Sequence, residues 1–309
     1  MKIGQCIVTG MVTATLLVAA SAIPPAPDAK SIPAQMVVTV SAASQSEQPP
    51  HLDAADLTVL EDKVATPIIG IEHLPGDLAD LQLFILMDDS TRSSSLGIQL
   101  PELKSFVEAL PPAAQVAVGY MRNGTVALTQ SFTTDRQKAL VAMRLPQAEP
   151  GVNGSPYFVL SDLVKHWPSK QPAVRREVLM LTDGVDRYYT AAIMDDPYVD
   201  AAIHDAQKNG VIVYSIYLRG AGLYGRGAWA TNIAQSRLIQ VSEETGGYAY
   251  FEEFTDPVTI SPFLNDLQNR LDNQYEVTIA ANEKGFQAVK VRTEVPGVKI
   301  DGPRHVFVP

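Results

Sequence analysis

Apolar residues follow two alternating patterns through the middle of the chain. Residues 81–87, 177–181 and 211–218 form runs that are almost continuously apolar, as in strands buried on both faces of a parallel sheet. Between these runs apolar residues recur at helical spacing, for example in residues 100–110, which a pair of prolines follows. Strands that alternate with helices predict an α/β fold.

Turn and cap residues mark the other elements. Asn123-Gly124 is a hairpin turn between predicted strands at residues 114–121 and 125–128. Ser155 and Pro156 have the residue types of a helix start. Further helices are expected at residues 135–143, 155–167, 197–209, 231–244 and 256–271, and a short strand at 248–251. We therefore predict a doubly wound, mostly parallel sheet with helices on both faces.

Both ends of the chain lack helical periodicity. Near the N-terminus, the apolar runs 57–60 and 67–71 suggest a hairpin, and residues 274–309 contain three predicted strands. We expect these two ends to pair into a small β unit that flanks the α/β domain. The predicted divisions are a signal peptide at 1–22, a linker with one strand at 23–50, the two parts of the β unit at 51–78 and 274–309, and the α/β domain at 79–273.

The first residues have the composition of a secretory signal. Lys2 precedes an apolar core, and Ala20-Ser21-Ala22 forms a small-residue cleavage site. The only cysteine, Cys6, lies inside this segment, so we expect a mature protein without disulfides that is periplasmic or secreted and has no integral membrane segment. A formal net charge of −10 disfavours nucleic acid as a partner and leaves cations and basic partners open.

Carboxylates and hydroxyls gather where two of the predicted strands end. Asp88-Asp89-Ser90 follows the first buried strand, and Asp183 follows the strand at residues 177–181, with Gly184 allowing a tight turn. Acidic side chains that converge on one edge repel each other unless a cation lies between them. Oxygen ligands with room for water suit Mg²⁺, and Mn²⁺ or Ca²⁺ are the alternatives.

At these residues the chain resembles the von Willebrand factor A domains, in which an Asp-x-Ser-x-Ser turn forms a metal ion-dependent adhesion site. The resemblance covers residues 81–273 and implies a metal set of Asp88, Ser90, Ser155 and Asp183. The chain also resembles a subgroup of exported bacterial von Willebrand factor A-related proteins, known especially from Acidobacteria. This second resemblance rests on Gly225-Arg-Gly-Ala-Trp229, Gln235-Ser-Arg-Leu238, Glu244-Thr-Gly-Gly247 and Leu271-Asp-Asn-Gln-Tyr275.

The third position of the adhesion turn departs from the family pattern. It is Arg92, which cannot bind a metal. Either Ser93 or Ser94 supplies the missing oxygen, or Arg92 folds over Asp88 and Asp183 and replaces the cation with a salt bridge. Ser155 matches the family's threonine, and a plain helix cap is an equally good interpretation of it.

The resemblance implies a protein-binding module for adhesion or assembly, in which the metal bridges to an acidic side chain of a partner. A metal-free structural module is the alternative. An Mg²⁺-dependent phosphohydrolase would rest on the pair Asp88-Asp89 alone, so we expect no enzyme. Four aromatic residues in loops near the site form either a recognition surface or packing against the β unit: Tyr188, Tyr189, Tyr198 and Trp229.

Overall fold

The computed structural model describes most of the chain after the predicted signal segment. It describes residues 31–43, 48–74, 76–78, 80–149, 151–152, 154–171, 175–189, 195–219, 227–253 and 255–309, and only the backbone of Ser93. The predicted signal peptide lies outside these residues, as do Gly225 and Arg226 of the run Gly225-Arg-Gly-Ala-Trp229. Within the described ranges, no helix is long and apolar enough to cross a membrane.

A six-stranded sheet forms the centre of the molecule, in the order β10-β9-β8-β5-β6-β7. All of its neighbouring strands are parallel except β7, which is antiparallel to β6. This sheet confirms the predicted α/β class. The strands are β5 (Leu81–Asp88), β6 (Gln115–Arg122), β7 (Thr125–Thr133), β8 (Arg175–Thr182), β9 (Val211–Tyr217) and β10 (Ala249–Tyr250).

Alternate side chains of β5 enter two separate cores, which explains why this strand is apolar throughout. Leu83, Ile85 and Met87 pack in one core with helices α1 and α6, whereas Phe84 and Leu86 pack in the other with α3, α4 and α5. The helices are α1 (Ser93–Ala109), α2 (Arg136–Ala142), α3 (Pro156–Lys165), α4 (Pro197–Lys208), α5 (Ala228–Thr245) and α6 (Ser261–Asp272).

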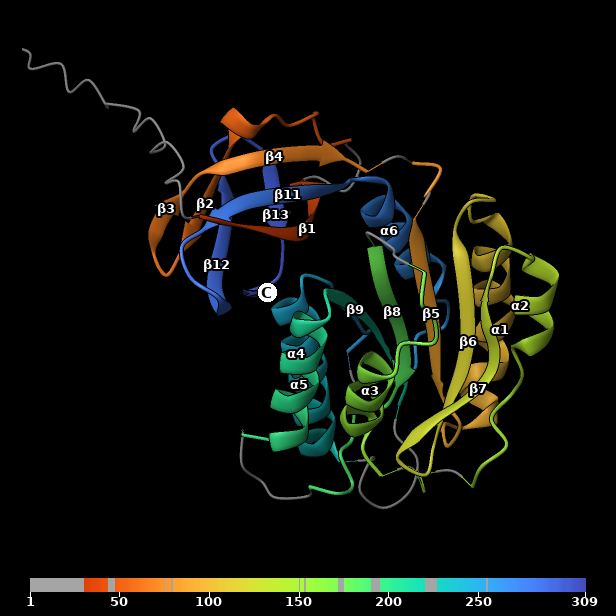
Figure 1. The fold of residues 1–309 in the computed structure, drawn as a ribbon. Helices are drawn as coiled ribbons and strands as arrows, with labels where there is room; N and C mark the ends of the chain where they lie inside the picture. The colour runs from red at the N-terminus through yellow and green to blue at the C-terminus, as the bar shows by residue number, and fades with distance from the viewer. Residues whose placement is uncertain are drawn as a thin grey trace, which may run out of the picture.

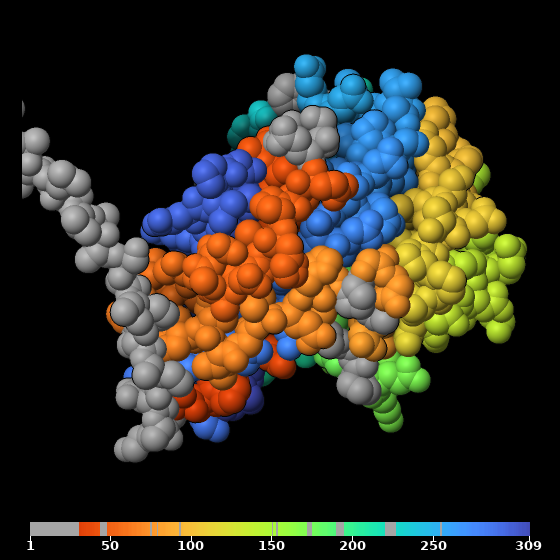
Figure 2. Space-filling model, turned by 90° about the horizontal axis from the view of Figure 1, so that it is seen from above, coloured from red at the N-terminus to blue at the C-terminus, as the bar shows by residue number. Residues whose placement is uncertain are grey.

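The two ends of the chain form the predicted β unit, but as two four-stranded sheets rather than one. Their orders are β13-β1-β11-β4 and β14-β12-β2-β3, and their inner faces share a third hydrophobic core. Seen from above, the N-terminal strands and the C-terminal residues lie side by side (Figure 2). The strands are β1 (Ile32–Ala42), β2 (Leu57–Glu61), β3 (Val64–Thr66), β4 (Ile68–His73), β11 (Gln274–Ala281), β12 (Gly285–Thr293), β13 (Val298–Asp301) and β14 (His305–Val308), with a short 3₁₀ turn at Ala54–Asp56.

Two expectations for this unit were wrong. Residues 36–40 are not a strand within a linker, because β1 lies in the middle of its sheet between β13 and β11. The run after Pro67 does not pair with β2: β2 turns tightly through Asp62 and Lys63, which both have positive φ, and pairs with β3. Pro67 then separates β3 from β4, which joins the other sheet beside β11.

The β unit and the carboxyl ends of the central strands lie at opposite ends of the molecule (Figure 1). The five parallel strands of the central sheet run away from the β unit, so the loops after β5 and β8 emerge at the far end. We call this far end the rim.

Candidate functional site

The two predicted carboxylate turns meet at the rim because β5 and β8 are neighbouring parallel strands. Their register pairs Met87 with Leu181, which places Asp88 next to Thr182 and Asp183. All three side chains are buried, with exposed fractions of 3% or less. The sequence therefore predicted correctly that acidic groups from these two turns converge.

Asp88 accepts hydrogen bonds from both turns. The backbone N–H and the hydroxyl of Ser90 each donate to its Oδ1 at 2.9 Å, and the Thr182 hydroxyl donates to its Oδ2 at 3.2 Å. Burial, followed by the charge of Asp183, raises the pKa of the Asp88 carboxyl, although the bonds from Ser90 oppose this shift. The Asp88 carboxylate and the Ser90 hydroxyl are thus in direct contact within this turn.

Asp183 is paired with an arginine from its own loop. The terminal nitrogens of Arg187 lie 2.6 Å from Asp183 Oδ2 and 3.4 Å from Oδ1, in a forked arrangement. Gly184, with a φ of 64°, makes the tight turn that brings Arg187 back over Asp183. Burial disfavours the charged guanidinium, but Asp183, Asp88 and Asp186 together raise the pKa of Arg187 above its usual value.

Arg92 does not take the position that the sequence suggested for it. It is the residue before α1, and among the described residues it makes no ion pair with Asp88 or Asp183. The compensating charge comes from Arg187, because the turn after β8 places residue 187 directly over residue 183. Of the substitute ligands, Ser94 is exposed on the first turn of α1, and the Ser93 side chain lies outside the described residues.

Ser155 caps α3, and its hydroxyl also contacts the turn after β8. Its Oγ accepts a hydrogen bond from the Phe158 N–H and donates one to Asp186 Oδ2. Asp186 in turn accepts bonds from the backbone N–H groups of Tyr188 and Tyr189. Ser155 therefore reaches the rim, but its partner is Asp186.

Asp89 faces away from Asp88 into a separate pair of arginines. Arg144 lies 2.7 Å from Asp89 Oδ1 and Arg122 lies 3.6 Å from Oδ2, and the Gln147 N–H donates to Oδ1. Burial opposes ionisation of Asp89, yet these bonds and the two guanidinium charges hold its pKa below the usual range. The carboxylates of Asp88 and Asp89 therefore belong to two separate sets of contacts.

The predicted metal ligands, as arranged, do not fit a divalent cation. Arg187 occupies the carboxylate of Asp183, and the Ser155 hydroxyl is engaged with Asp186. The third turn position is the cationic Arg92. No cluster of three or more His, Cys, Asp or Glu side chains with metal-binding geometry occurs in the described part of the chain.

Three aromatic side chains at the rim contact one another, and we call Phe158, Tyr188 and Tyr198 the rim aromatics. Their ring centroids are 5.7 to 6.2 Å apart and their planes are close to perpendicular, at 65° to 84°. Tyr188 and Phe158 are 51% and 43% exposed. Tyr198 is partly buried against the second core. A Cβ added at Gly154 would lie 2.0 Å from the Tyr188 ring, so this ring rests directly on the backbone.

The rim aromatics do not pack against the β unit, since that unit lies at the other end of the sheet (Figure 1). The interpretation that the loop aromatics pack against the β unit is therefore wrong for Tyr188 and Tyr198. Trp229, at the start of α5, is 58% exposed and is not in ring contact with them in the described structure.

The sequence interpretation missed three residues of the site: Thr182, Asp186 and Arg187. A signal for them was present in the run Thr182-Asp-Gly-Val-Asp-Arg187, which places an acid and an arginine three and four residues after Asp183. A glycine turn next to Asp183 allows this short segment to fold back on itself.

No family model matches the chain, and no curated protein matches it. Its fold is similar to that of several solved structures. An aerotolerance-related membrane protein from Bacteroides fragilis NCTC 9343 is 12% identical over 62% of this chain and 98% of that chain, with a TM-score of 0.45. Proximal thread matrix protein 1 from the mussel byssus, with a zinc-occupied MIDAS motif, is 14% identical over 69% and 50%, with a TM-score of 0.47. The manganese-loaded TRAP protein of Plasmodium vivax is 11% identical over 78% and 98%, with a TM-score of 0.40. These similarities concern the fold alone.

Proposed function

The chain has a von Willebrand factor A-type fold, and on this premise we propose that it is an exported, non-enzymatic module that binds a protein partner at its rim. The observation that carries the proposal is the cluster of rim aromatics, in which the Phe158 and Tyr188 rings are exposed, at an end of the sheet where Asp183 and Asp89 are paired with arginines. Exposed aromatic side chains held rigidly on a scaffold are typical anchors of protein interfaces.

Catalysis is disfavoured by the way in which the rim groups are engaged. Arg187 pairs with Asp183, Arg144 pairs with Asp89, and Ser155 is bound to Asp186. An aspartate that accepts a phosphoryl group must instead present an accessible carboxylate oxygen to its substrate. We expect no turnover of generic phosphate esters.

The chemistry of the rim suits a basic side chain of the partner. A lysine or arginine is attracted to the faces of aromatic rings, most strongly where water is excluded. Asp195 and Asp200, on either side of Tyr198 in the sequence, are exposed, and the whole chain has a formal net charge of −10. These acids favour the approach of a cationic segment.

A cation-bridged adhesion site is the second candidate. It is favoured by the convergence of Asp88, Ser90 and Thr182, whose oxygens belong to the type that Mg²⁺ and Mn²⁺ prefer. In this version an acidic side chain of the partner would complete the metal coordination. It requires Arg187 to leave Asp183, because a guanidinium and a divalent cation cannot share that carboxylate.

Calorimetric titration of the mature chain with Mg²⁺ and Mn²⁺ separates the two candidates. We expect no saturable heat up to millimolar concentrations. A saturable heat that disappears in the Asp183→Ala variant would replace our proposal with the cation-bridged site.

Binding of a fluorescent lysine-rich peptide tests the role of the rim aromatics. The fluorescence anisotropy of the peptide is measured at about 0.15 M salt, so that long-range electrostatic attraction is screened. We expect Tyr188→Ala to weaken binding by about tenfold, the effect of losing one desolvated cation–π contact. Trp229→Ala removes an equally exposed aromatic residue outside the cluster and should leave binding unchanged. Equal effects of the two variants, or no binding of the peptide, would contradict the proposal.

A further inference from the structure

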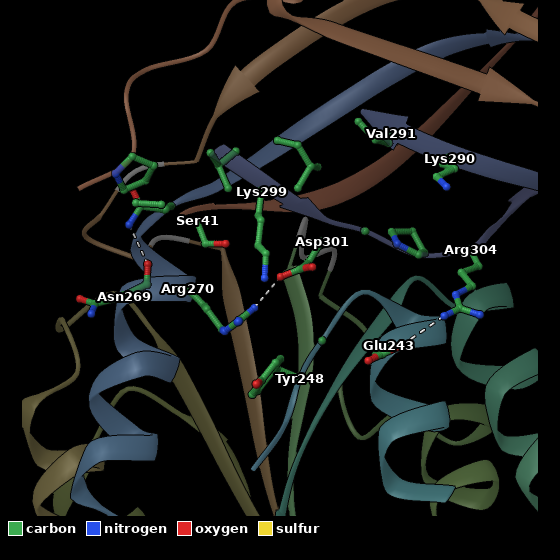
Figure 3. Close-up of a pocket in the computed structure, with 18 of the residues that line it drawn as sticks. Ser41, Glu243, Tyr248, Asn269, Arg270, Lys290, Val291, Lys299, Asp301 and Arg304 are labelled. Carbon is green, nitrogen blue, oxygen red and sulfur yellow. Dashed lines mark hydrogen bonds and ion pairs between the residues drawn. The ribbon is translucent and has the colours of Figure 1, made fainter. Parts of the chain in front are cut away.

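A cavity of about 920 Å³ lies between the β unit and the α/β domain, at the end of the central sheet opposite the rim. Its wall includes residues of α5, α6, β1, β12 and β13 (Figure 3). Arg270 pairs there with Asp266 at 2.7 Å and with Asp301 at 2.9 Å. Arg304 pairs with Glu243 at 3.2 Å. The acidic and basic side chains of the cavity thus largely compensate one another, and the cavity favours neither sign of ligand charge.

Two histidines from separate segments lie together on the surface of the β unit. His51 precedes β2 in a segment without regular structure, and His73 is the last residue of β4. Their ring centroids are 5.8 Å apart and their planes are almost perpendicular, at 82°. The His51 side chain is 67% exposed and His73 is also exposed, so a solute can reach both rings.

Tyr275 of β11 holds the ring of His51 in place. Its hydroxyl lies 3.2 Å from His51 Nδ1 and accepts a hydrogen bond from the Leu52 N–H. Tyr275 is only 3% exposed, and its ring also lies against His73, with 4.7 Å between the centroids. An imidazole whose Nδ1–H donates to such an oxygen keeps a lone pair on Nε2, and metal-binding histidines are commonly held in this way.

The separation of the two rings suits a shared metal ion. A zinc–nitrogen bond of about 2.1 Å places the ion about 3.2 Å from the ring centre, so two imidazoles on one tetrahedral ion have centres about 5.2 Å apart. The observed separation of 5.8 Å is longer by about 0.6 Å, which a small turn of the exposed His73 side chain would remove. Imidazole nitrogens select transition ions such as Zn²⁺ over Mg²⁺ and Ca²⁺, which prefer oxygen.

Asp53 places a carboxylate beside His51. Its Oδ1 lies 3.9 Å from His51 Nε2, compared with about 3.4 Å between two ligands of a tetrahedral zinc ion. The backbone of Asp53 is held by a hydrogen bond from its N–H to Asp56 Oδ2, whereas its side chain is 83% exposed. The described structure contains no closed set of three such ligands, so the Asp53 side chain has to rotate toward the histidines to complete one.

We propose that His51, His73 and Asp53 bind a Zn²⁺ ion, with water as the fourth ligand. Two imidazoles, one carboxylate and one water form a common ligand set of zinc in proteins. The ion would link the chain that leads into β2, in one sheet of the β unit, to the end of β4, in the other sheet. This inference is independent of the function proposed for the rim.

The test is calorimetric titration of the mature chain with Zn²⁺ in a buffer that does not bind the metal. We expect one ion per chain, and His51→Gln and His73→Gln should each weaken binding by at least about tenfold, since each removes a ligand. Asp53→Asn should also weaken binding. His166→Gln is the matched control, because His166 is 74% exposed and lies 3.1 Å from a carboxylate of Asp162, far from this site in the sequence.

Thermal unfolding gives a second readout. An ion that binds only the folded chain raises its Tm, so Zn²⁺ should raise the Tm of the natural chain and of His166→Gln, but not that of His73→Gln. The exchanged side chains are exposed, so the variants should fold, and their circular dichroism spectra confirm that before titration.

Four outcomes would overturn the proposal. The first is the absence of saturable heat with Zn²⁺. The second is an effect of His166→Gln as large as that of His73→Gln, which would indicate adventitious binding by surface histidines. The third is unchanged binding by Asp53→Asn, which would exclude the three-ligand site. The fourth is binding that survives His73→Gln and disappears in Asp183→Ala, which would place the ion at the rim.

Discussion

The charged groups at the two ends of the central sheet differ in their burial. At the rim, buried acidic groups are paired inside the protein: Asp183 with Arg187 and Asp89 with Arg144. At the cavity, Lys290 and Lys299 are exposed and lack acidic partners in the described structure. The recognisable motif therefore lies at the end where its own acid, Asp183, is already paired with an arginine.

This difference shows that a motif and an available site are separate properties. The Asp-x-Ser turn and the Thr-Asp-Gly turn are in place, but a neighbouring guanidinium has taken the position that a cation would need. The cavity has no motif, because its residues come from strands and helices that are far apart in the sequence. Stability and binding measurements on matched variants test this contrast.

The largest expected effect is that of Arg187→Gln. The variant leaves Asp183, which is 3% exposed, without its cation, and breaking a buried ion pair in this way costs about 3 to 5 kcal/mol of unfolding free energy. Urea unfolding at pH 7 measures the loss. A loss below about 1 kcal/mol would show that the rim does not depend on this pair, in the range of a surface ion pair.

The next effect concerns Glu177 of β8, a buried acid near the β unit that forms no salt bridge in the described part of the chain. Burial raises its pKa to about 7, from an ordinary value of 4.5, against a hydrogen bond from Gln274 and the charge of Arg175. Between these two values the folded state retains a proton that the unfolded state releases, so Glu177 lowers stability as the pH rises through this window.

Glu177→Gln should remove this dependence. We expect the variant to exceed the natural chain in unfolding free energy by about 3 kcal/mol at pH 8, with the gap closing below pH 4.5. Urea unfolding of both chains from pH 4 to pH 8 gives the difference. A gap that is independent of pH would mean that Glu177 does not titrate in this window.

Ser155→Ala should have a smaller effect, of about 1 kcal/mol, the usual cost of losing a helix N-cap. The variant removes the bonds to the Phe158 N–H and to Asp186, while the carboxylates of β5 and β8 keep their partners. Ser94→Ala, at an exposed helical position, is the control. If Ser155→Ala cost as much as Arg187→Gln, Ser155 would be part of the charge network and not a cap.

The smallest change is expected for Arg304→Ala at the wall of the cavity. Arg304 is 57% exposed and pairs with Glu243 and Glu244, and exposed ion pairs of this kind contribute at most about 1 kcal/mol. The unfolding free energy that the variant loses should also become smaller as salt is added, because salt screens exposed charges. A loss comparable to that of Arg187→Gln would remove the distinction between the two ends.

Much of the fold was predictable because buried segments have a recognisable pattern of apolar residues in the sequence. β5 is apolar throughout since both of its faces enter a core, and parallel neighbours necessarily bring Asp88 and Asp183 to one edge. Local turn chemistry was equally clear at Asn123-Gly124, where both residues have positive φ.

Pairing between distant segments was not predictable in the same way. The apolar pattern of residues 67–71 predicts a strand but does not say which strand lies beside it, and Pro67 sends it to the second sheet. The partner of Asp183 depends on the path of a short loop, so the sequence suggested Arg92 alone, and Arg187 was found only from the geometry. A cavity between two structural units produces no periodic pattern in the sequence, so it could not be predicted.

The central place of β1 sets an order for the making of the protein. Ile32 pairs with Ala281, and the other side of the strand pairs with β13, so neither neighbour exists until nearly the whole chain has been synthesised. Until then β1 presents two unpaired edges, which favour association with other chains. We expect chains that stop before β11 to aggregate, because β1 can be paired on both edges only after β11 and β13 have been synthesised.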